Sequence, residues 1–343
     1  MLALLLTGGI AAAAAPQGPR LAVVKASSKP PGLELVTVNR NGGDPLRLAG
    51  GGLRSRPWVD SFSPLSWSPD GERVAFSGMV GFRKGDDYEP IRKLFTVRAD
   101  GSALRPVRGT NGAVGPVFSP DGHTLAFTRS VEREAPTTIG GKLRKEGFDG
   151  ASIWTVDLRT GAQRQLTPWR DGLEYFASSF SPDGSTLLAT HEDALLLNEA
   201  EPVALNLDGS GSRRLLDDGT SPVYSPDGSR IALVRRTVEY GDDRGEDSDL
   251  YVIDADGGGI RRLTRTPGRH ELFPSWDPSG ERLAYVRFSA ARTEAAAFGV
   301  GDALMQINAD GTCQSKVASG PSMAFFVPAW QLGPGRGAGR IEC

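Results

Sequence analysis

Cysteine, histidine and net charge are all scarce in this sequence. The 343 residues include only two cysteines and three histidines, and neither cysteine belongs to a C-x-x-C pair, which disfavours a thiolate zinc site. A formal net charge of −2 excludes a strongly basic protein, so we expect no nucleic-acid partner. The motifs G-x-S-x-G, G-x-x-x-x-G-K-[ST] and H-E-x-x-H are absent as well. Together these absences favour binding over catalysis.

Long apolar runs are lacking too, except at the N-terminus. Leu2–Leu6 and Ile10–Ala15 form a stretch that is too short to cross about 30 Å of hydrocarbon as a helix, and it ends in alanines before Pro16. This pattern is typical of a signal peptide, so we expect residues 1–15 to be removed and residues 16–343 to be periplasmic or secreted. An uncleaved apolar N-terminus is the alternative. We expect no membrane span elsewhere.

Glycine and proline are abundant, with 44 and 24 residues, and much of this excess belongs to a repeat. In each copy an aromatic residue enters a Pro-Asp-Gly turn, and an alternating apolar strand leaves it. Five copies occur, the last with a changed turn sequence: Trp67-Ser68-Pro69-Asp70-Gly71, Phe118-Ser119-Pro120-Asp121-Gly122, Phe180-Ser181-Pro182-Asp183-Gly184, Tyr224-Ser225-Pro226-Asp227-Gly228 and Trp276-Asp277-Pro278-Ser279-Gly280.

Each copy has the chemistry of a β-hairpin. Proline presets φ near −65°, aspartate bonds back to the backbone, and glycine takes the positive φ that closes the turn. A second hairpin follows each copy, as in Tyr251-Val252-Ile253-Asp254 before Asp256-Gly257. Two hairpins make four antiparallel strands per repeat. We expect the aromatic residues at positions 67, 118, 180, 224, 276 and 330 to be core residues between neighbouring sheets.

The spacing of these aromatics predicts the number of repeats. They lie about 53 residues apart on average, so residues 16–343 hold about six repeats. No Pro-Asp-Gly strand follows Trp330, whereas the segment from Arg20 to Val24 has the sequence pattern of such a strand. We therefore predict an all-β, six-bladed β-propeller, with four antiparallel strands per blade, closed by exchange of the N- and C-terminal strands in one domain.

The repeat resembles the propeller repeat of TolB-like proteins, and the resemblance covers essentially all of residues 16–343. TolB, the periplasmic component of the Tol-Pal envelope system, carries an α/β domain ahead of its propeller. Only about twenty residues precede the first predicted strand here, so we expect no counterpart of that domain. The same repeat also forms the propeller of prolyl-oligopeptidase-like peptidases. The resemblance therefore implies a fold and leaves the function open.

Long insertions distinguish one face of the predicted propeller, because they connect the second strand of a blade to the third. The tight turns lie on the opposite face. Long loops on a rigid scaffold are where binding residues gather, so this long-loop face is the predicted working surface. The insertions are 78–92, 129–151, 191–202, 235–249 and 287–302.

Two histidine–carboxylate pairs, His191-Glu192 and His270-Glu271, are candidate binding residues on the long-loop face. Their blades are not neighbours, so a joint metal site would have to form across the mouth of the channel. A divalent metal is one interpretation, because imidazole and carboxylate are suitable ligands. Ordinary solvated residues are the simpler one, and we expect no catalytic residue and no cofactor.

Charged clusters provide the other candidates on this face. The acidic segment 242–249, which includes Asp247 and Asp249, could hold calcium, but it lacks the D-x-D-x-D-G spacing and is expected to be hydrated. Lys142 and Arg144 belong to a small basic cluster in the 129–151 insertion. This cluster could dock an acidic partner or an anionic envelope polymer, or it could serve only solubility.

The two cysteines are expected to meet on the short-turn face. Cys313 follows the Asp310-Gly311 turn, and the chain leaves Trp330 on the same face before it reaches Cys343. A disulfide between them would close a loop of about 30 residues and stabilise the fold by about 3–4 kcal/mol. Two free thiols are the alternative.

These features predict an exported, monomeric, non-enzymatic binding scaffold of the cell envelope. It would recognise a protein or an envelope polymer through the long-loop face. The alternative is a propeller enzyme, a metal-assisted lyase or hydrolase with its site at the mouth of the channel.

Overall fold

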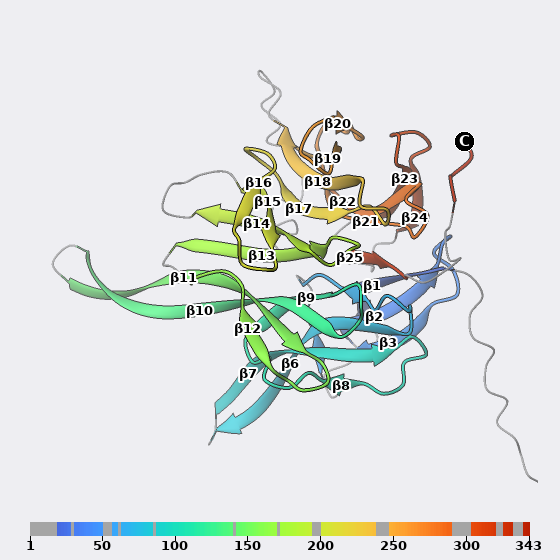
Figure 1. Cartoon of the computed structure of the whole chain (residues 1–343). Helices are drawn as coiled ribbons and strands as arrows, with labels where there is room; N and C mark the ends of the chain where they lie inside the picture. The colour runs from blue at the N-terminus through green and yellow to red at the C-terminus, as the bar shows by residue number, and fades with distance from the viewer. Residues whose placement is uncertain are drawn as a thin grey trace, which may run out of the picture.

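The described part of the chain is built from β-strands alone (Figure 1). The computed structural model describes residues 19–28, 31–50, 57–60, 63–84, 87–139, 142–169, 172–193, 200–237, 247–289, 303–319, 325–331 and 339–343. Twenty-five strands in these ranges form four sheets. Among these residues no helix is long and apolar enough to cross a membrane. The all-β prediction is therefore confirmed, and the predicted signal peptide lies outside the described residues.

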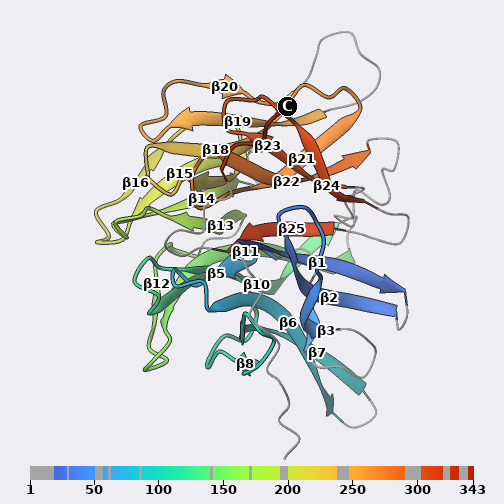
Figure 2. The same ribbon diagram turned by 90° about the vertical axis from the view of Figure 1, so that its right-hand side faces the viewer.

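One four-stranded sheet joins the two ends of the chain. Its order is β25-β1-β2-β3, and Leu21 of β1 pairs with Trp330 of β25. Figure 2 shows the red C-terminal strand beside the blue N-terminal strand. This is the pairing that the sequence predicts for the last blade. The strands are β1 (Arg20–Ser28), β2 (Pro31–Asn39), β3 (Leu46–Gly50) and β25 (Phe325–Trp330).

The other three sheets repeat the same four-stranded unit. A five-stranded sheet has its first strand in two pieces, and each eight-stranded sheet consists of two antiparallel units joined by one parallel residue pair, Ala151 with Glu174 or Ser248 with His270. The first of these sheets contains β4 (Trp58–Val59), β5 (Ser66–Trp67), β6 (Arg73–Lys84), β7 (Asp87–Arg98) and β8 (Arg105–Pro106).

The eight-stranded sheets follow in chain order. One contains β9 (Ala113–Phe118), β10 (Thr124–Ile139), β11 (Lys142–Asp157), β12 (Gln163–Gln165), β13 (Leu173–Phe180), β14 (Thr186–Asp193), β15 (Glu201–Asn206) and β16 (Ser212–Arg214). The other contains β17 (Thr220–Tyr224), β18 (Arg230–Thr237), β19 (Asp247–Asp254), β20 (Arg261–Arg262), β21 (Arg269–Trp276), β22 (Arg282–Ser289), β23 (Ala303–Asn308) and β24 (Ser315–Ser319).

The first strands of the units contact one another in succession. β5 contacts β9, β9 contacts β13, β13 contacts β17, β17 contacts β21, β21 contacts β25, and β25 contacts β5. Five of these strands contain a register shift, and four of the five carry a proline beside it, which suits strands with one unpaired edge. These prolines are Pro116, Pro222, Pro274 and Pro328, and Pro64 lies between β4 and β5.

The repeated turns owe their shape to a serine–aspartate pair. Ser68 Oγ donates to Asp70 Oδ1 at 2.5 Å and accepts from the backbone N–H of Arg73, so one side chain closes the turn from both ends. In the fifth turn the two residues exchange places, since Ser279 Oγ donates to Asp277 Oδ2 at 2.7 Å. The changed sequence of that turn thus keeps the same pair in reverse order.

The aromatics that enter the turns are core residues, as predicted. Trp67 and Trp330 are each 2% exposed, and Phe118, Phe180 and Trp276 are also buried, whereas Tyr224 is only half-buried. The indole N–H of Trp67 donates to the carbonyl of Ala329 in the neighbouring sheet at 2.9 Å. The indole N–H of Trp276 donates to the carbonyl of Val223 at 3.1 Å in the same way, so these two indoles fasten one unit to the next.

Two of the predicted loops are strands instead. Segments 78–92 and 129–151 lie in the hairpins β6–β7 and β10–β11, whose residues pair in continuous register as far as Lys84–Asp87 and Ile139–Lys142. Antiparallel pairing satisfies the backbone groups that an irregular loop would leave to water. Two residues separate the strands in each case, Gly85-Asp86 and Gly140-Gly141, and such dipeptides favour tight hairpins.

Candidate functional site

A cavity of about 560 Å³ lies where the first strands of the units meet. Residues of β5, β9, β13, β17, β21 and β25 all line it, and they include all six of the repeated aromatics. Apolar, aromatic and proline side chains form most of its wall, together with several serine and threonine hydroxyls. A concave, mostly apolar site with a few polar groups is the usual form of a small-ligand pocket.

Among the described residues that line this cavity, Glu192 is the only one with a carboxylate. Burial raises the pKa of Glu192, while the electrostatic effects of Arg236 and His191 act in the opposite direction. Its directly opposite neighbour across the β13–β14 pair is another acid, Glu174. A carboxylate with a raised pKa in a cavity is a candidate for a functional group.

His191 lies on the other face of the sheet from Glu192, because side chains alternate along β14. Its ring stacks on Tyr175 with 4.5 Å between the ring centroids, and its Nδ1 atom lies 3.8 Å from Glu201 Oε2. Within the described residues, His191 Nε2 is buried and has no hydrogen-bond partner. The structure thus separates the two residues that the sequence groups as one pair.

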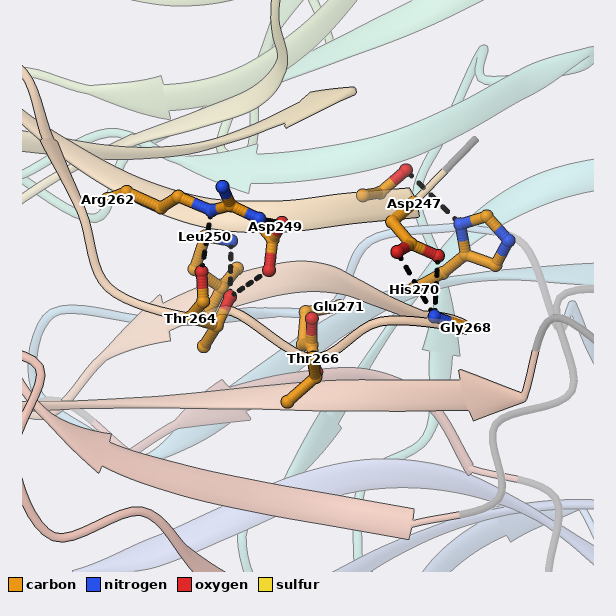
Figure 3. Close-up of polar contacts among 10 residues, drawn as sticks. Asp247, Asp249, Leu250, Arg262, Thr264, Thr266, Gly268, His270 and Glu271 are labelled. Atoms are coloured by element: carbon orange, nitrogen blue, oxygen red, sulfur yellow. Dashed lines mark hydrogen bonds and ion pairs between the residues drawn. The ribbon is translucent and has the colours of Figure 1, made fainter. Parts of the chain in front are cut away.

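The other predicted acidic and histidine residues come together at the junction of β19 and β21 (Figure 3). Both oxygens of the Asp247 carboxylate accept from the backbone N–H of Gly268, at 3.0 and 3.1 Å. His270 Nδ1 lies 3.3 Å from Ser248 Oγ. The parallel pairing of Ser248 with His270 is what places these segments side by side.

Asp249 and Glu271 are almost completely buried at this junction, with 1% and 0% exposure. Asp249 accepts from Arg262 Nη2 at 2.6 Å and from the Thr264 hydroxyl at 2.9 Å. Each predicted binding residue of this group therefore has a polar contact inside the protein.

Glu271 is held by its cross-strand neighbour. Arg287 pairs with Glu271 in register, and its Nε atom donates to Glu271 Oε1 at 2.8 Å, while the Thr266 hydroxyl donates to the same oxygen at 2.5 Å. Burial raises the pKa of Glu271, against the opposing effects of Thr266 and Arg287. The Arg287 guanidinium also donates to the hydroxyl of Tyr285, whose pKa burial raises. Glu271 and Arg287 thus form an ion pair between β21 and β22 that supports the sheet.

The described residues contain no group of three or more His, Cys, Asp or Glu side chains that could hold a metal ion. His191 and His270 belong to different eight-stranded sheets, on β14 and β21. Of the segment 242–249, which the sequence suggests for calcium, residues 242–246 lie outside the described residues.

Lys142 and Arg144 lie apart from the other candidates, near the far end of the β10–β11 hairpin. Their register partners are Ile139 and Thr137. The structure describes the backbone there and not the side chains. The basic residues are thus carried on a strand rather than on the predicted loop.

A disulfide joins Cys313 to Cys343, with 5.3 Å between the Cα atoms. The position of the Asp310-Gly311 turn and the path of the chain after Trp330 favour this disulfide over two free thiols. The tail is also held by Asn308, which donates to the carbonyl of Ile341 at 3.0 Å and accepts from its N–H at 2.8 Å. The C-terminal residues thus pack against the β23–β24 turn.

Comparison with known proteins places this geometry among propellers. No protein-family model matches the chain. An uncharacterised protein of Agrobacterium fabrum is 25% identical over 230 residues, which cover 64% of this chain and 68% of that protein. An uncharacterised peptidase of Bacillus subtilis is 25% identical over 69% of this chain and 30% of its own length. The Tol-Pal system protein TolB of Anaeromyxobacter dehalogenans is 33% identical over 132 residues, 37% of this chain and 27% of that protein. The matched region is thus less than a third of the last two proteins.

Solved structures resemble nearly the whole chain. TolB from Acinetobacter baumannii has a TM-score of 0.65 at 20% identity, covering 92% of this chain and 67% of that one. A putative TolB from Agrobacterium tumefaciens has a TM-score of 0.56 at 16% identity, covering 91% and 98%. At such identities the likeness concerns the fold. The fold of this chain is that of a TolB-like β-propeller.

Proposed function

We propose that this chain is an exported, non-enzymatic binding scaffold of the cell envelope, which recognises a protein or an envelope polymer through its long-loop face. The observation that carries the proposal is the β10–β11 hairpin, which extends well beyond the strands beside it (Figure 1). β9 pairs only with residues 125–129 of β10, and β12 only with residues 154–156 of β11. We call residues 131–139 and 142–149 the arm.

The arm suits recognition because its backbone edges are open. Among the described residues no further strand pairs with residues 131–139 or 142–149. A two-stranded ribbon without a third strand is only marginally stable alone, and its unpaired N–H and C=O groups can add a strand from a partner. The arm also carries Lys142 and Arg144, which would favour an acidic protein or an anionic polymer. The hairpin β6–β7 extends on the same side of the molecule in Figure 1.

The scaffold beneath the arm is inferred to be six blades around one axis, closed by the pairing of β25 with β1. The succession of contacts from β5 through β21 to β25 and back to β5 supports this arrangement. The cavity lined by all six first strands supports it too. A ring closed in this way is a rigid base on which long hairpins can be presented.

We further propose residues 1–15 as a signal peptide, a periplasmic or secreted location, and a monomeric state. The disulfide between Cys313 and Cys343 supports export, because such bonds persist in oxidising compartments. Among the predicted site residues, we assign Lys142 and Arg144 to partner recognition on the arm. Asp247, Asp249, His270 and Glu271 make internal contacts instead, which support a role in holding the long-loop face in shape.

A propeller enzyme is the alternative function. The observation that favours an enzyme is the alignment of 69% of this chain with a Bacillus subtilis protein named as a peptidase. That alignment covers 30% of the peptidase, so the activity of the whole protein does not transfer with it.

The test is quantitative capture with and without the arm. The mature protein and a variant in which residues 131–149 are replaced by a Gly-Ser turn would be immobilised and exposed to the same envelope extract. We expect at least one component to be depleted about tenfold or more on the shortened variant. A matched control would shorten the β6–β7 hairpin at residues 82–90 instead.

The depleted component would then be purified and titrated against both proteins. Direct binding to the full protein and loss on the shortened variant would support the proposal. Equal binding to both would place recognition elsewhere and overturn it. The melting curves of both shortened variants must match that of the mature protein, because a misfolded variant would lose binding whether or not the deleted hairpin recognises the partner.

A further inference from the structure

Prolines reduce the number of backbone N–H donors on the wall of the central cavity. Seven of its lining residues are prolines, and proline has no backbone N–H. Several of its hydroxyls already accept bonds from the backbone, as Thr190 does from Ser221 at 3.0 Å and Ser275 from Trp330 at 3.1 Å. Carbonyl groups of unpaired strand edges and hydroxyl oxygens remain as acceptors. The wall therefore offers acceptors to the N–H groups of a ligand, beside the hydroxyl donors that it also carries.

Glu192 lies beside an aromatic ring on this wall. Thr190 and Glu192 are two positions apart on β14, so they share one face of the sheet, and Phe176 is the register partner of Thr190. A diagonal neighbour of this kind is within reach of a long side chain. All three residues line the cavity. A carboxylate and an aromatic ring therefore share one part of the wall.

A second ring comes from β21. Phe273 lines the cavity and has φ of 59°, a left-handed conformation that is rare for a bulky residue and costs about 1–3 kcal/mol. Gly115, which also precedes a proline, takes the same conformation in β9, where glycine does so without strain. Strained residues of this kind cluster at ligand sites.

From these observations we propose that the central cavity binds the ammonium group of a ligand with an apolar body, with Glu192 as the counter-ion and the ring of Phe176 beside the cation. The carboxylate supplies the charge, the acceptors on the wall take the N–H groups, and aromatic faces attract cations. This site is separate from the arm, so it goes beyond the proposed function.

A metal ion is a poorer match for the same cavity. Hard cations take six or more oxygen ligands, usually with more than one carboxylate among them, and Glu192 is the only acid among the described lining residues. A neutral apolar ligand would desolvate the Glu192 carboxylate and bring no charge to offset this cost. Arg236 and His191 offset part of its charge, and neither lines the cavity, so we expect tenfold rather than much larger selectivity.

The experiment compares n-hexylammonium with 1-hexanol, which has the same length and no charge. Isothermal titration of the full protein would give both affinities, and tryptophan fluorescence would locate binding, because Trp67, Trp276 and Trp330 line the cavity. We expect hexylammonium to bind at least tenfold more tightly than hexanol. A blocked peptide with a single lysine would show whether the ammonium group can also come from a protein side chain.

The variant Glu192→Gln should lose this preference, with hexylammonium binding at least tenfold weaker and hexanol binding unchanged. Glu72→Gln is the matched control, because Glu72 is exposed on a turn and does not line the cavity. Equal affinities of the two probes for the unmodified protein would overturn the proposal, whatever the folding of the variant. Unchanged hexylammonium binding by a folded Glu192→Gln variant would overturn it as well.

Discussion

Two identical dipeptides, His191-Glu192 and His270-Glu271, have different surroundings in this molecule. Glu271 lies directly across from Arg287, which donates to it at 2.8 Å, and its side chain is fully buried. Glu192 lies directly across from Glu174 and lines the central cavity. The cross-strand neighbour thus makes one carboxylate a structural ion pair and leaves the other available to a ligand. Identical sequence motifs need not have identical roles.

The largest expected effect concerns the ion pair. Replacement Glu271→Ala leaves the guanidinium of Arg287 without its carboxylate in a largely buried site, and it should destabilise the fold by about 3 kcal/mol. Denaturation with urea would measure this difference. The double replacement Glu271→Leu with Arg287→Met should recover much of the loss, because no charge is then left unpaired. If Glu271→Ala left the free energy of unfolding unchanged, Glu271 would not be a structural residue, and the difference between Glu271 and Glu192 would be disproved.

A smaller effect is expected at His191. Replacement His191→Ala removes the ring that stacks on Tyr175 and should cost about 1 kcal/mol. Replacement His191→Phe keeps the stack and removes the buried Nε2 atom that has no hydrogen-bond partner among the described residues, so stability should stay the same or rise. Thermal unfolding of both variants would test this. A loss on His191→Phe equal to that on His191→Ala would mean that the imidazole nitrogens matter and the stacking does not.

The smallest effect is expected for Glu192→Gln. Burial raises the pKa of Glu192, so the folded state takes up its proton at a higher pH than the unfolded state. The ionised carboxylate therefore costs stability at neutral pH, and this cost disappears as the pH falls through the raised pKa. The side chain is partly exposed, which keeps the effect small, and we expect the variant to melt about 1–2 °C higher at pH 7.

The difference for Glu192→Gln should disappear near pH 4, where both proteins carry a neutral side chain at position 192. Melting curves of the two proteins between pH 4 and pH 7 would measure it. A variant that melts lower than the parent protein at pH 7 would show that Glu192 is structural like Glu271, and the contrast would be lost.

Much of the fold could be predicted from local chemistry. The aromatic, proline and glycine of each repeat identify a turn, and the structure adds that the serine and aspartate of that turn form a hydrogen-bonded pair. In Trp276-Asp277-Pro278-Ser279-Gly280 the pair is reversed, which preserves the bond although the sequence looks divergent. Gly85-Asp86 and Gly140-Gly141 are hairpin signals, and they favour paired strands over the loops predicted at 78–92 and 129–151.

The candidate site could be predicted only in part. The prolines beside the register shifts indicate strands with an open edge, and such strands line the cavity. The repeated aromatics, in contrast, predict core residues and do not indicate a cavity. The arginines of the fourth strands bond to backbone carbonyls of the next unit. Arg213 donates to the backbone carbonyl of Asp256 at 2.7 Å, in the next unit, and its partner is 43 residues away in the sequence. Nothing local predicts such a contact.

The sequence by itself determined the repeating unit, because turns depend on backbone conformations that proline, glycine and aspartate favour within a few residues. It also determined that the C-terminal strand needs N-terminal partners, since each unit requires four strands. Only the tertiary structure decided which of the acidic side chains are paired inside the protein and which one lines the cavity. That outcome depends on what stands opposite each residue across a strand pair and on neighbouring units, where contacts join residues far apart in the chain.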